Sequence, residues 1–394
     1  MHILFITNKY RLKLLVIILI TTLVCILSYN PVTFTLSQIL DENELKIEIE
    51  RIYNVRSTCL ATGDFLPLKS LFDTSQKYGQ WSLDHEVRRV KYLKDWSSAR
   101  GISFINIEST VRIKKIYNRS STVKISLEES YKFDYIYISD PEPVINTFGV
   151  GIRHTLDLVE KNEVKVIYSD WYTDCFEDAM SHYSGNIPDA PTLNQEPVLD
   201  TSTGSYELNL KSYYDRQKAV EYADKYCGAP WGSKNNFKYN KIYMDYNGAG
   251  GDCTNFISQV LGDKGGGSIP SDSTWHSAIS KYGNSPGSSA WVNAKAFKDY
   301  LLYSGKGSVI RKGTYKELTS PFQGAPNGAV AKLQLGDLVC YEKKGHIDHF
   351  AVITGRDSRG YPLVNSHTTD RYHVPWDLGW SDSGIKFFLI HING

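Results

Sequence analysis

The hydrophobic pattern of the sequence changes its period twice, and this change limits the folds that the chain can adopt. Apolar residues recur with helical spacing over residues 36–96 and alternate with a period of two over residues 104–170. The same order returns later, with helical segments over residues 213–302 and alternating segments over residues 338–392. Helices followed by a run of strands are typical of α+β domains with antiparallel sheets. We therefore predict two α+β domains in series.

The boundary between these domains is indicated by residues that favour turns. A chain of 394 residues exceeds one ordinary domain. Prolines and a small polar run interrupt the segment that follows the first set of strands. We place the first domain at residues 31–185, a linker at residues 186–210 and the second domain at residues 211–394.

A basic flank and an apolar run stand at the start of the sequence. Lys9, Arg11 and Lys13 precede an apolar run over residues 14–27. This pattern is typical of a signal peptide or a short signal anchor. Because no small-x-small cleavage site follows, the pattern favours an uncleaved anchor, and the basic flank places the remaining chain outside the cytoplasm. We predict a membrane or signal helix at residues 1–30, and a protein that is held at the cell membrane or secreted.

The charge balance and the cysteines exclude several classes of function. Lys and Arg number 44 against 43 Asp and Glu, which gives no electrostatic basis for binding nucleic acid. The six cysteines are scattered without a CxxC pair, so they indicate neither a zinc site nor a disulfide scaffold. We predict no cofactor.

The first domain carries a recognisable order of elements. Its helices precede its strands, and the pattern closes with two alternating segments at residues 151–159 and 164–170. Over residues 35–180 this order resembles the cone-shaped domain of the nuclear-transport-factor-2-like and SnoaL-like superfamily. The resemblance implies a fold that in some members holds a ligand or catalytic pocket. No matched acid–base pair stands here, so we predict structural roles for His154 and Asp170 and leave the ligand and the protein partner open.

One cysteine of the second domain stands at a predicted helix start. Gly250 and Gly251 lead through Asp252 into Cys253, and an apolar pattern of helical period begins at Phe256. The unpaired N–H groups at a helix start favour an anion, so they should stabilise a thiolate. The alternative interpretation is a small buried residue on an amphipathic helix.

A cysteine nucleophile needs a base, and the base needs a third group that orients it. His349 stands near the start of a predicted strand over residues 348–355, so a rigid element would hold its ring. The next predicted strand, residues 361–367, places Asn365 and His367 on one face. Either side chain could accept a hydrogen bond from the His349 ring if the two strands pair.

Five blocks in the second domain occur together in a recognisable order. They are residues 252–259, 291–294, 335–339, 348–355 and 366–372. Together they resemble the bacterial "Putative amidase domain" family, which is considered a relative of the papain-like, NlpC-type cell-wall peptidases. The resemblance runs from about residue 213 to the end. It implies a papain-like α+β fold with helices and a small antiparallel sheet.

The resemblance also implies an activity and a site. The activity is hydrolysis of amide bonds, with Cys253 as nucleophile and His349 as general base and acid. Asn365 occupies the position of the third polar residue, where many NlpC-type enzymes carry a histidine, so His367 remains an alternative. We predict a surface-anchored or secreted cysteine amidase or peptidase that acts on a peptide or on peptidoglycan. Backbone N–H groups at the helix start would bind the oxyanion, with Asn247 and Tyr246 as side-chain candidates.

Two other functions are compatible with the sequence. The fold could serve as a surface-anchored, non-catalytic module for binding or assembly. The domain could also be a zinc-dependent amidase, because His346, Asp348, His349, His367 and His373 stand close together in sequence. None of these residues forms the helical HExxH arrangement, and a zinc site would leave Cys253 without a role.

Overall fold

The computed structural model describes residues 31–118, 121–185, 213–280, 283–382 and 384–394. These residues fall into two compact units, one ending at Arg51 and the other running from Ile52 to Gly394. The predicted membrane or signal helix at residues 1–30 and the predicted linker at residues 186–210 lie outside the described residues. Within the described part, no helix is long and apolar enough to cross a membrane.

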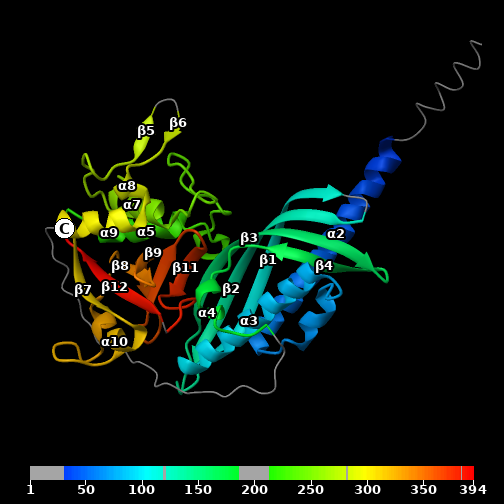
Figure 1. The fold of residues 1–394 in the computed structure, drawn as a ribbon, viewed down its shortest axis with the longest axis horizontal. Coiled ribbons are helices and arrows are strands. Elements are labelled where there is room, and N and C mark those ends of the chain that lie inside the picture. The colour runs from blue at the N-terminus through cyan, green and yellow to red at the C-terminus, as the bar shows by residue number, and fades with distance from the viewer. Residues whose placement is uncertain (1–30, 119–120, 186–212, 281–282, 383) are drawn as a thin grey trace, which may run out of the picture. The chain divides into compact units, whose positions relative to one another are not determined.

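Helices form the first part of the first domain, as the helical spacing predicts. They are α2 (Pro31–Thr62), the short 3₁₀ helix η1 (Leu66–Leu71) and α3 (Lys77–Ala99). Helix α3 buries Leu83, Val87, Val90 and Leu93, which recur at three- and four-residue spacing on one face. This face packs against the first and fourth strands of the sheet (Figure 1).

Four antiparallel strands complete the first domain. They are β1 (Ile102–Asn118), β2 (Val123–Tyr137), β3 (Asn146–Lys161) and β4 (Val164–Trp171). Strands β1 and β2 pair over their full length, and β3 pairs with both β2 and β4. Within the alternating region at residues 104–170, one long strand, β2, therefore covers residues 123–137. A short helix, α4 (Glu177–Met180), follows.

The second domain begins with helices that surround the predicted nucleophile. They are α5 (Arg216–Tyr226), α6 (Pro230–Ser233), α7 (Cys253–Gly262), α8 (Ser289–Val292) and α9 (Ala294–Tyr303), with a small hairpin of β5 (Ala278–Ser280) and β6 (Gly283–Ser285) between α7 and α8. Helix α7 begins at the predicted cysteine, which confirms the helix start expected from the sequence.

The remaining elements are mostly strands. They are β7 (Gly307–Gly313), α10 (Tyr315–Thr319), η2 (Ala329–Lys332), β8 (Leu338–Lys343), β9 (His346–Arg356), β10 (Pro362–Ser366), β11 (Asp370–Pro375) and β12 (Ile385–Ile392). The antiparallel sheet and the mixture of helices and strands confirm the predicted α+β class.

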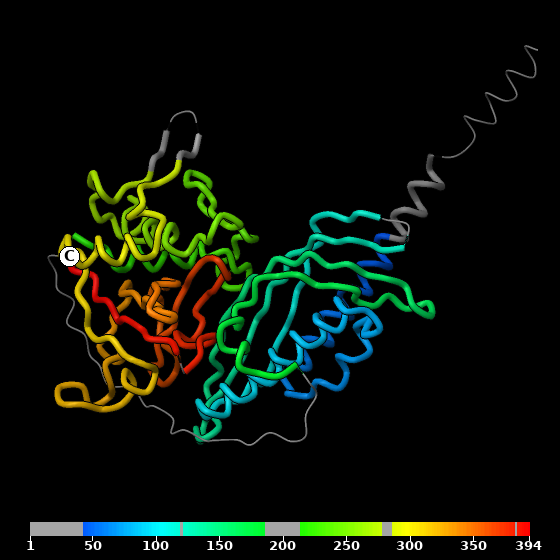
Figure 2. The backbone as a smooth tube through the Cα atoms, in the orientation of Figure 1, coloured from blue at the N-terminus to red at the C-terminus, as the bar shows by residue number. Residues whose placement is uncertain are grey.

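The second domain does not have a small sheet of its own, which corrects the prediction. Its strands extend the sheet of the first domain in the order β1-β2-β3-β11-β10-β9-β8-β12-β7, with β4 also on β3. The junction is the pairing of Asp370, Arg371 and Tyr372 on β11 with residues 149–151 on β3. Figure 2 shows the green trace of β3 beside the orange-red trace of β11. The sequence does not indicate β11, because its first residues are polar and directly follow a turn.

The sheet of the second domain separates two cores. Under α5, α7 and α9 the core includes Phe256, Phe350 and Val352. The opposite core includes Tyr341 and Ile353, together with further apolar residues of β8, β10, β12 and the segment after β11. Successive residues of β9 therefore alternate between the two cores, which fixes the face on which each side chain of the candidate site lies.

Candidate functional site

The start of helix α7 is built so that its first N–H groups stay available. Gly250 and Gly251 have φ angles of 103° and 109°, a region in which residues with a Cβ are strained. They lead to Asp252 at the N-cap position, but within the described residues no side chain caps this helix. The Asp252 carboxylate instead accepts hydrogen bonds of 2.9 Å from the Tyr246 backbone N–H and from Asn255 Nδ2. The N–H groups of the first turn are therefore left for an anion.

Cys253 lies beside these groups and keeps 8% of its surface exposed. Its Sγ is 3.7 Å from the Thr254 hydroxyl. Burial raises the pKa of the Cys253 thiol, while the Thr254 hydroxyl and the backbone N–H groups of Phe350 and Thr254 act in the opposite direction. The resting form is a protonated thiol, placed next to donors that would stabilise the thiolate once it forms.

His349 lies on strand β9, directly opposite Tyr341 on β8. The centroid of its ring is 5.5 Å from the Tyr341 ring and 5.5 Å from the Trp380 ring. Burial, together with the charges of Arg371 and His367, lowers the pKa of His349 to about 3. The imidazole is therefore neutral at ordinary pH.

Cys253 and His349 lie on neighbouring elements, but the described contacts include no hydrogen bond between the Cys253 sulfur and the His349 ring. The backbone N–H of Phe350, the residue after His349, points to the Cys253 sulfur. Helix α7 thus begins against the start of β9. The His349 ring, however, lies on the face of Tyr341 and Trp380, and the hydrogen bonds of the described residues include none between this ring and Cys253. Proton transfer needs the ring to turn toward the sulfur, a rearrangement that often accompanies substrate binding.

Asn365 does not orient His349 in this structure. It pairs with Val352, so it lies on the face under α7, whereas His349, three residues before Val352, lies on the other face. Its Oδ1 accepts from Thr354 Oγ1 at 2.8 Å and from the His373 backbone N–H at 2.7 Å. Its Nδ2 donates to an Asp224 carboxylate oxygen at 2.9 Å. The predicted hydrogen bond to His349 is not formed, because strand alternation separates the two side chains.

His367 is held by the N-cap residue and by a second helix. Its Nδ1 is 2.6 Å from Asp252 Oδ2, and its Nε2 is 2.6 Å from the Tyr226 carbonyl oxygen. Both ring nitrogens thus face oxygen atoms that accept hydrogen bonds. The ring is stacked between Tyr239 and Phe256, with centroid distances of 3.7 and 3.9 Å. Both nitrogens of His367 are occupied by these contacts, and the ring fixes the position of Asp252.

The turn between β10 and β11 also holds the helix start. Thr368 Oγ1 accepts a 3.0 Å hydrogen bond from the backbone N–H of Asp252. Thr368 has a φ of 81°, which is unfavourable for a β-branched residue. Such strain persists only where the surrounding structure fixes it, and it concentrates at functional sites. These contacts are not predictable from local pattern, although the acidic residue directly before Cys253 is a position that needs partners.

The side-chain candidates for the oxyanion site have other partners. Asn247 Nδ2 donates to the Tyr239 hydroxyl at 2.9 Å, and the Tyr246 hydroxyl accepts from the Gly287 backbone N–H at 3.0 Å. The backbone N–H groups at the start of α7 are the remaining candidates. They need no side chain to be present in the right geometry.

The histidines considered for zinc do not converge. His373 Nε2 lies 2.9 Å from Asp224 Oδ1, His346 is exposed, and His367 and His349 have the neighbours described above. In the part of the chain that the structure describes, no three His, Cys, Asp or Glu side chains are grouped to hold one metal ion.

The polar residues singled out in the first domain contact one another. His154 is buried between Glu129 and Asp170, with a distance of 3.0 Å from a ring nitrogen to each carboxylate. Asp170 also pairs with Arg56 at 2.9 Å. Each charge has an opposite partner, as a structural network requires.

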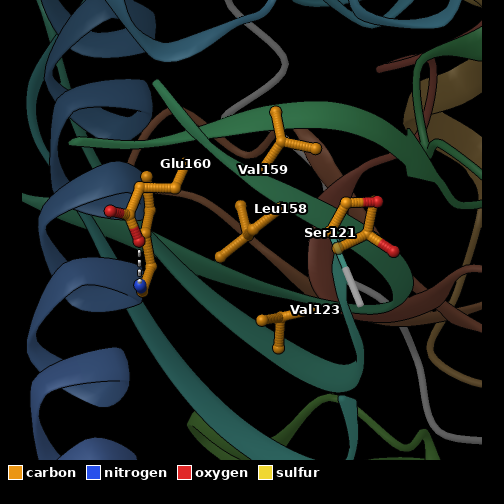
Figure 3. A pocket seen from close by; sticks show the side chains of 7 residues that line it. Ser121, Val123, Leu158, Val159 and Glu160 are labelled. Carbon is orange, nitrogen blue, oxygen red and sulfur yellow. Dashed lines mark ion pairs between the residues drawn. The ribbon is translucent and has the colours of Figure 1, made fainter. Parts of the chain in front are cut away.

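A separate pocket of about 220 Å³ lies on the first domain (Figure 3). Val123, Leu158 and Val159 line it, and an ion pair of 3.5 Å joins Glu160 and Lys165 at its side. None of the predicted catalytic residues lines this pocket.

Comparison with known proteins suggests a hydrolase. Residues 213–390 match the family described as "Putative amidase domain". Over 212 residues the chain is 31% identical to YjcM of Bacillus subtilis (strain 168), an uncharacterized protein; the alignment covers 52% of this chain and 41% of YjcM. It is 29% identical over 188 residues to YhbB of the same organism, also uncharacterized, covering 45% of this chain and 50% of YhbB. The chain thus spans half or less of the length of these relatives.

Two solved structures align with about a third of the chain. One is the intermembrane space region of the chloroplast protein ARC6, with 6% identity, a TM-score of 0.22 and coverage of 32% of this chain and 95% of that one. The other is a chain named Rd1NTF2_05, with 13% identity, a TM-score of 0.19 and coverage of 34% and 99%. TM-scores of this size do not assign a fold. The cone-like fold of the first domain, like the papain-like relation of the second, stays a prediction.

Proposed function

We propose that the second domain is a cysteine amidase or peptidase that cleaves amide bonds through an acyl-enzyme. The observation that carries this proposal is the position of Cys253. It is the first residue of a helix that no described side chain caps, and it lies against the start of the strand that bears a neutral His349. Nucleophile, base and unpaired backbone donors are the three parts that acyl transfer to cysteine needs.

The proposed reaction starts from a thiol and a neutral imidazole, not from an ion pair. On substrate binding the His349 ring turns to Cys253 and takes the proton from its sulfur. The sulfur forms a bond to the amide carbon, and the carbonyl oxygen becomes an oxyanion that the N–H groups of the first turn of α7 bind. The C–N bond breaks, and the amine leaves with the proton from His349. Water then adds to the thioester with His349 as base, which releases the acid and returns the proton to Cys253.

The substrate class follows from the resemblance to cell-wall peptidases. We propose a peptide amide bond in peptidoglycan, reached by a protein that is membrane-anchored or secreted through residues 1–30. A non-catalytic binding module would need neither an uncapped helix start at Cys253 nor a neutral histidine on the neighbouring strand. These two features favour the enzyme over the non-catalytic module.

The test uses the full chain with Cys25 replaced by Ser in every variant, because Cys25 lies outside the described residues. Purified peptidoglycan and a panel of muropeptides are incubated with the parent, Cys253→Ala, His349→Ala and the control His346→Ala. His346 is an exposed histidine on the same strand, so its removal should leave the site intact. We expect new amine termini with the parent and the control. In Cys253→Ala and His349→Ala the rate at which amine termini form should fall by more than 100-fold. Removal of a nucleophile or base typically lowers the rate by a factor of ~10²–10⁶.

A second measurement separates the chemistry from the choice of substrate. The thiol of a cysteine hydrolase adds to the carbonyl of a peptide aldehyde and forms a hemithioacetal. Mass spectrometry then identifies the modified cysteine. The other described cysteines are between 0% and 3% exposed, so Cys253 should be the modified residue. Adduct formation without release of amines from any muropeptide would contradict peptidoglycan as substrate. A folded Cys253→Ala variant that cleaves at the parental rate would contradict the cysteine mechanism.

A further inference from the structure

We infer that Arg153, on strand β3 of the first domain, is a positioning residue for the helix that begins at Cys253. The first domain then helps to position the site. This inference rests on the proposed function for its catalytic readout only. It is carried by a chain of contacts that runs from β3 to the N-cap of α7.

The first contact is an ion pair between the two domains. Arg153 Nη2 lies 2.9 Å from Asp370 Oδ2. Asp370 is the first residue of β11, is completely buried and pairs in register with Gly151 of β3. A buried carboxylate needs a charged partner or several donors, and Arg153 is the cation that supplies it here.

The second contact joins this ion pair to a tyrosine near the site. The Tyr239 hydroxyl donates to Asp370 Oδ1, and Arg153 Nη1 lies 3.4 Å from the same hydroxyl. Burial and the Asp370 charge raise the pKa of Tyr239, so the phenol keeps the proton that it donates. The Asn247 amide adds a 2.9 Å hydrogen bond to the hydroxyl. The ring of Tyr239 is thereby fixed on its polar side.

The third contact passes from the tyrosine to the helix start. The Tyr239 ring stacks on His367 with a centroid distance of 3.7 Å and an interplanar angle of 18°. His367 in turn binds Asp252, and Asp252 precedes Cys253. Any tilt of Tyr239 changes the support of the His367 ring and with it the direction of the first turn of α7. Misplacement of a nucleophile by about 1 Å is enough to cost on the order of 100-fold in rate.

Glycines where the two domains meet show that this close approach depends on the absence of side chains. A Cβ on Gly151 would lie 2.9 Å from the Phe237 ring and 3.2 Å from the Cβ of Asp370. A Cβ on Gly228 would lie 2.4 Å from Asp370 Oδ2. Both distances to Asp370 are shorter than ordinary contacts, so the carboxylate is enclosed by backbone from both domains.

The experiment compares Arg153→Met with Arg153→Lys and with the control Arg359→Met. Arg359 forms another ion pair between the domains, with Asp140, and also donates to Ser139, so these described partners lie outside the chain of residues leading to α7. If Arg153→Met lowers the yield of folded protein, Tyr239→Phe replaces it, because this change removes only the hydroxyl. The readouts are kcat and KM, the alkylation rate of Cys253, and the proton resonance of the His367 ring. The rings of Tyr239 and Phe256, which stack on His367, should displace this resonance upfield.

We expect Arg153→Met to lower kcat by about tenfold or more with KM changed less than about twofold, since binding groups stay in place. The His367 resonance should move toward its ordinary position, and the Cys253 alkylation rate should change. Arg153→Lys should restore part of each effect, and Arg359→Met should leave all three at parental values.

An unchanged His367 resonance and an unchanged alkylation rate in folded Arg153→Met would overturn the inference, whether or not the protein is an enzyme. Equal effects of Arg359→Met would also overturn it, because they would indicate general loosening between the domains. If the parent cleaves no amide while the resonance and the labelling respond as expected, the proposed function fails and the positioning role stands.

Discussion

Protonation of His349 should be costly for the folded protein, and this cost provides a quantitative test of the site. The ordinary pKa of histidine is 6.5, and burial lowers that of His349 to about 3. Between these values the unfolded chain binds a proton that the folded protein does not bind. The stability contributed by neutral His349 is therefore complete above pH 6.5 and is lost as the pH falls toward 3.

The magnitude follows from the size of the shift. Each pH unit within this window changes the free energy of unfolding by about 1.4 kcal/mol per group. Lowering the pH from about 6.5 to about 4.5 should thus remove on the order of 3 kcal/mol that depends on His349. The replacement His349→Phe keeps a buried ring against Tyr341 and Trp380 but does not titrate, so it should lack this loss.

The assay is urea unfolding of parent and variant at several pH values across this window. Other groups titrate equally in both proteins, so the difference between the two free energies of unfolding isolates His349. We expect the parent to lose stability relative to His349→Phe as the pH falls, and the NMR titration of the His349 ring to show the neutral form down to about pH 4. A constant difference, or a ring that titrates near 6.5, would refute both the burial argument and the neutral base.

Three further predictions concern other parts of the same structure. Burial alone would lower the pKa of His154, but the carboxylates of Asp170 and Glu129 raise it overall. The stability that protonated His154 contributes is therefore present below pH 6.5 and lost as the pH rises. In urea unfolding, His154→Gln should reduce this loss of stability at higher pH. Asp252→Asn should leave the buried His367 ring without its carboxylate partner, lowering stability by about 3–5 kcal/mol and amide cleavage by more than tenfold, measured by unfolding and by amine release. Gly151→Ala should press a methyl group on Phe237 and lower the thermal midpoint, through a cost of about 1–3 kcal/mol.

The sequence predicts the helix start at Cys253 and the strand of His349, because both depend on local patterns. It does not predict the face on which His349 lies. That face is set by the register of β9 against β8, which is interrupted by a shift next to Tyr341. A shift of one residue exchanges the two faces of a strand, so periodicity alone does not decide whether His349 and Asn365 meet.

The sheet that joins the two domains depends on contacts between distant residues. Residues 149–151 of β3 pair with Asp370, Arg371 and Tyr372, and nothing in either segment alone marks the other as its partner. The bond between His367 and Asp252 is equally distant in sequence. Both residues belong to the blocks that resemble the family, but the resemblance implied no role for this pair. Such pairings follow from packing of the whole chain and are beyond propensity and spacing.

The start of α7 indicates how the chain reconciles stability with chemistry. An aspartate at an N-cap normally accepts from its own helix, and the loss of such a cap costs about 1 kcal/mol. Asp252 binds His367 and Asn255 instead, so these bonds compensate for the missing cap while the Asp252 side chain leaves the first-turn N–H groups uncapped. A cap on these groups would stabilise the helix and also occupy the donors that an oxyanion needs. The usual N-capping of a helix by its own first aspartate is thus absent directly before the predicted nucleophile. There, uncapped N–H groups would be most useful to a catalytic site.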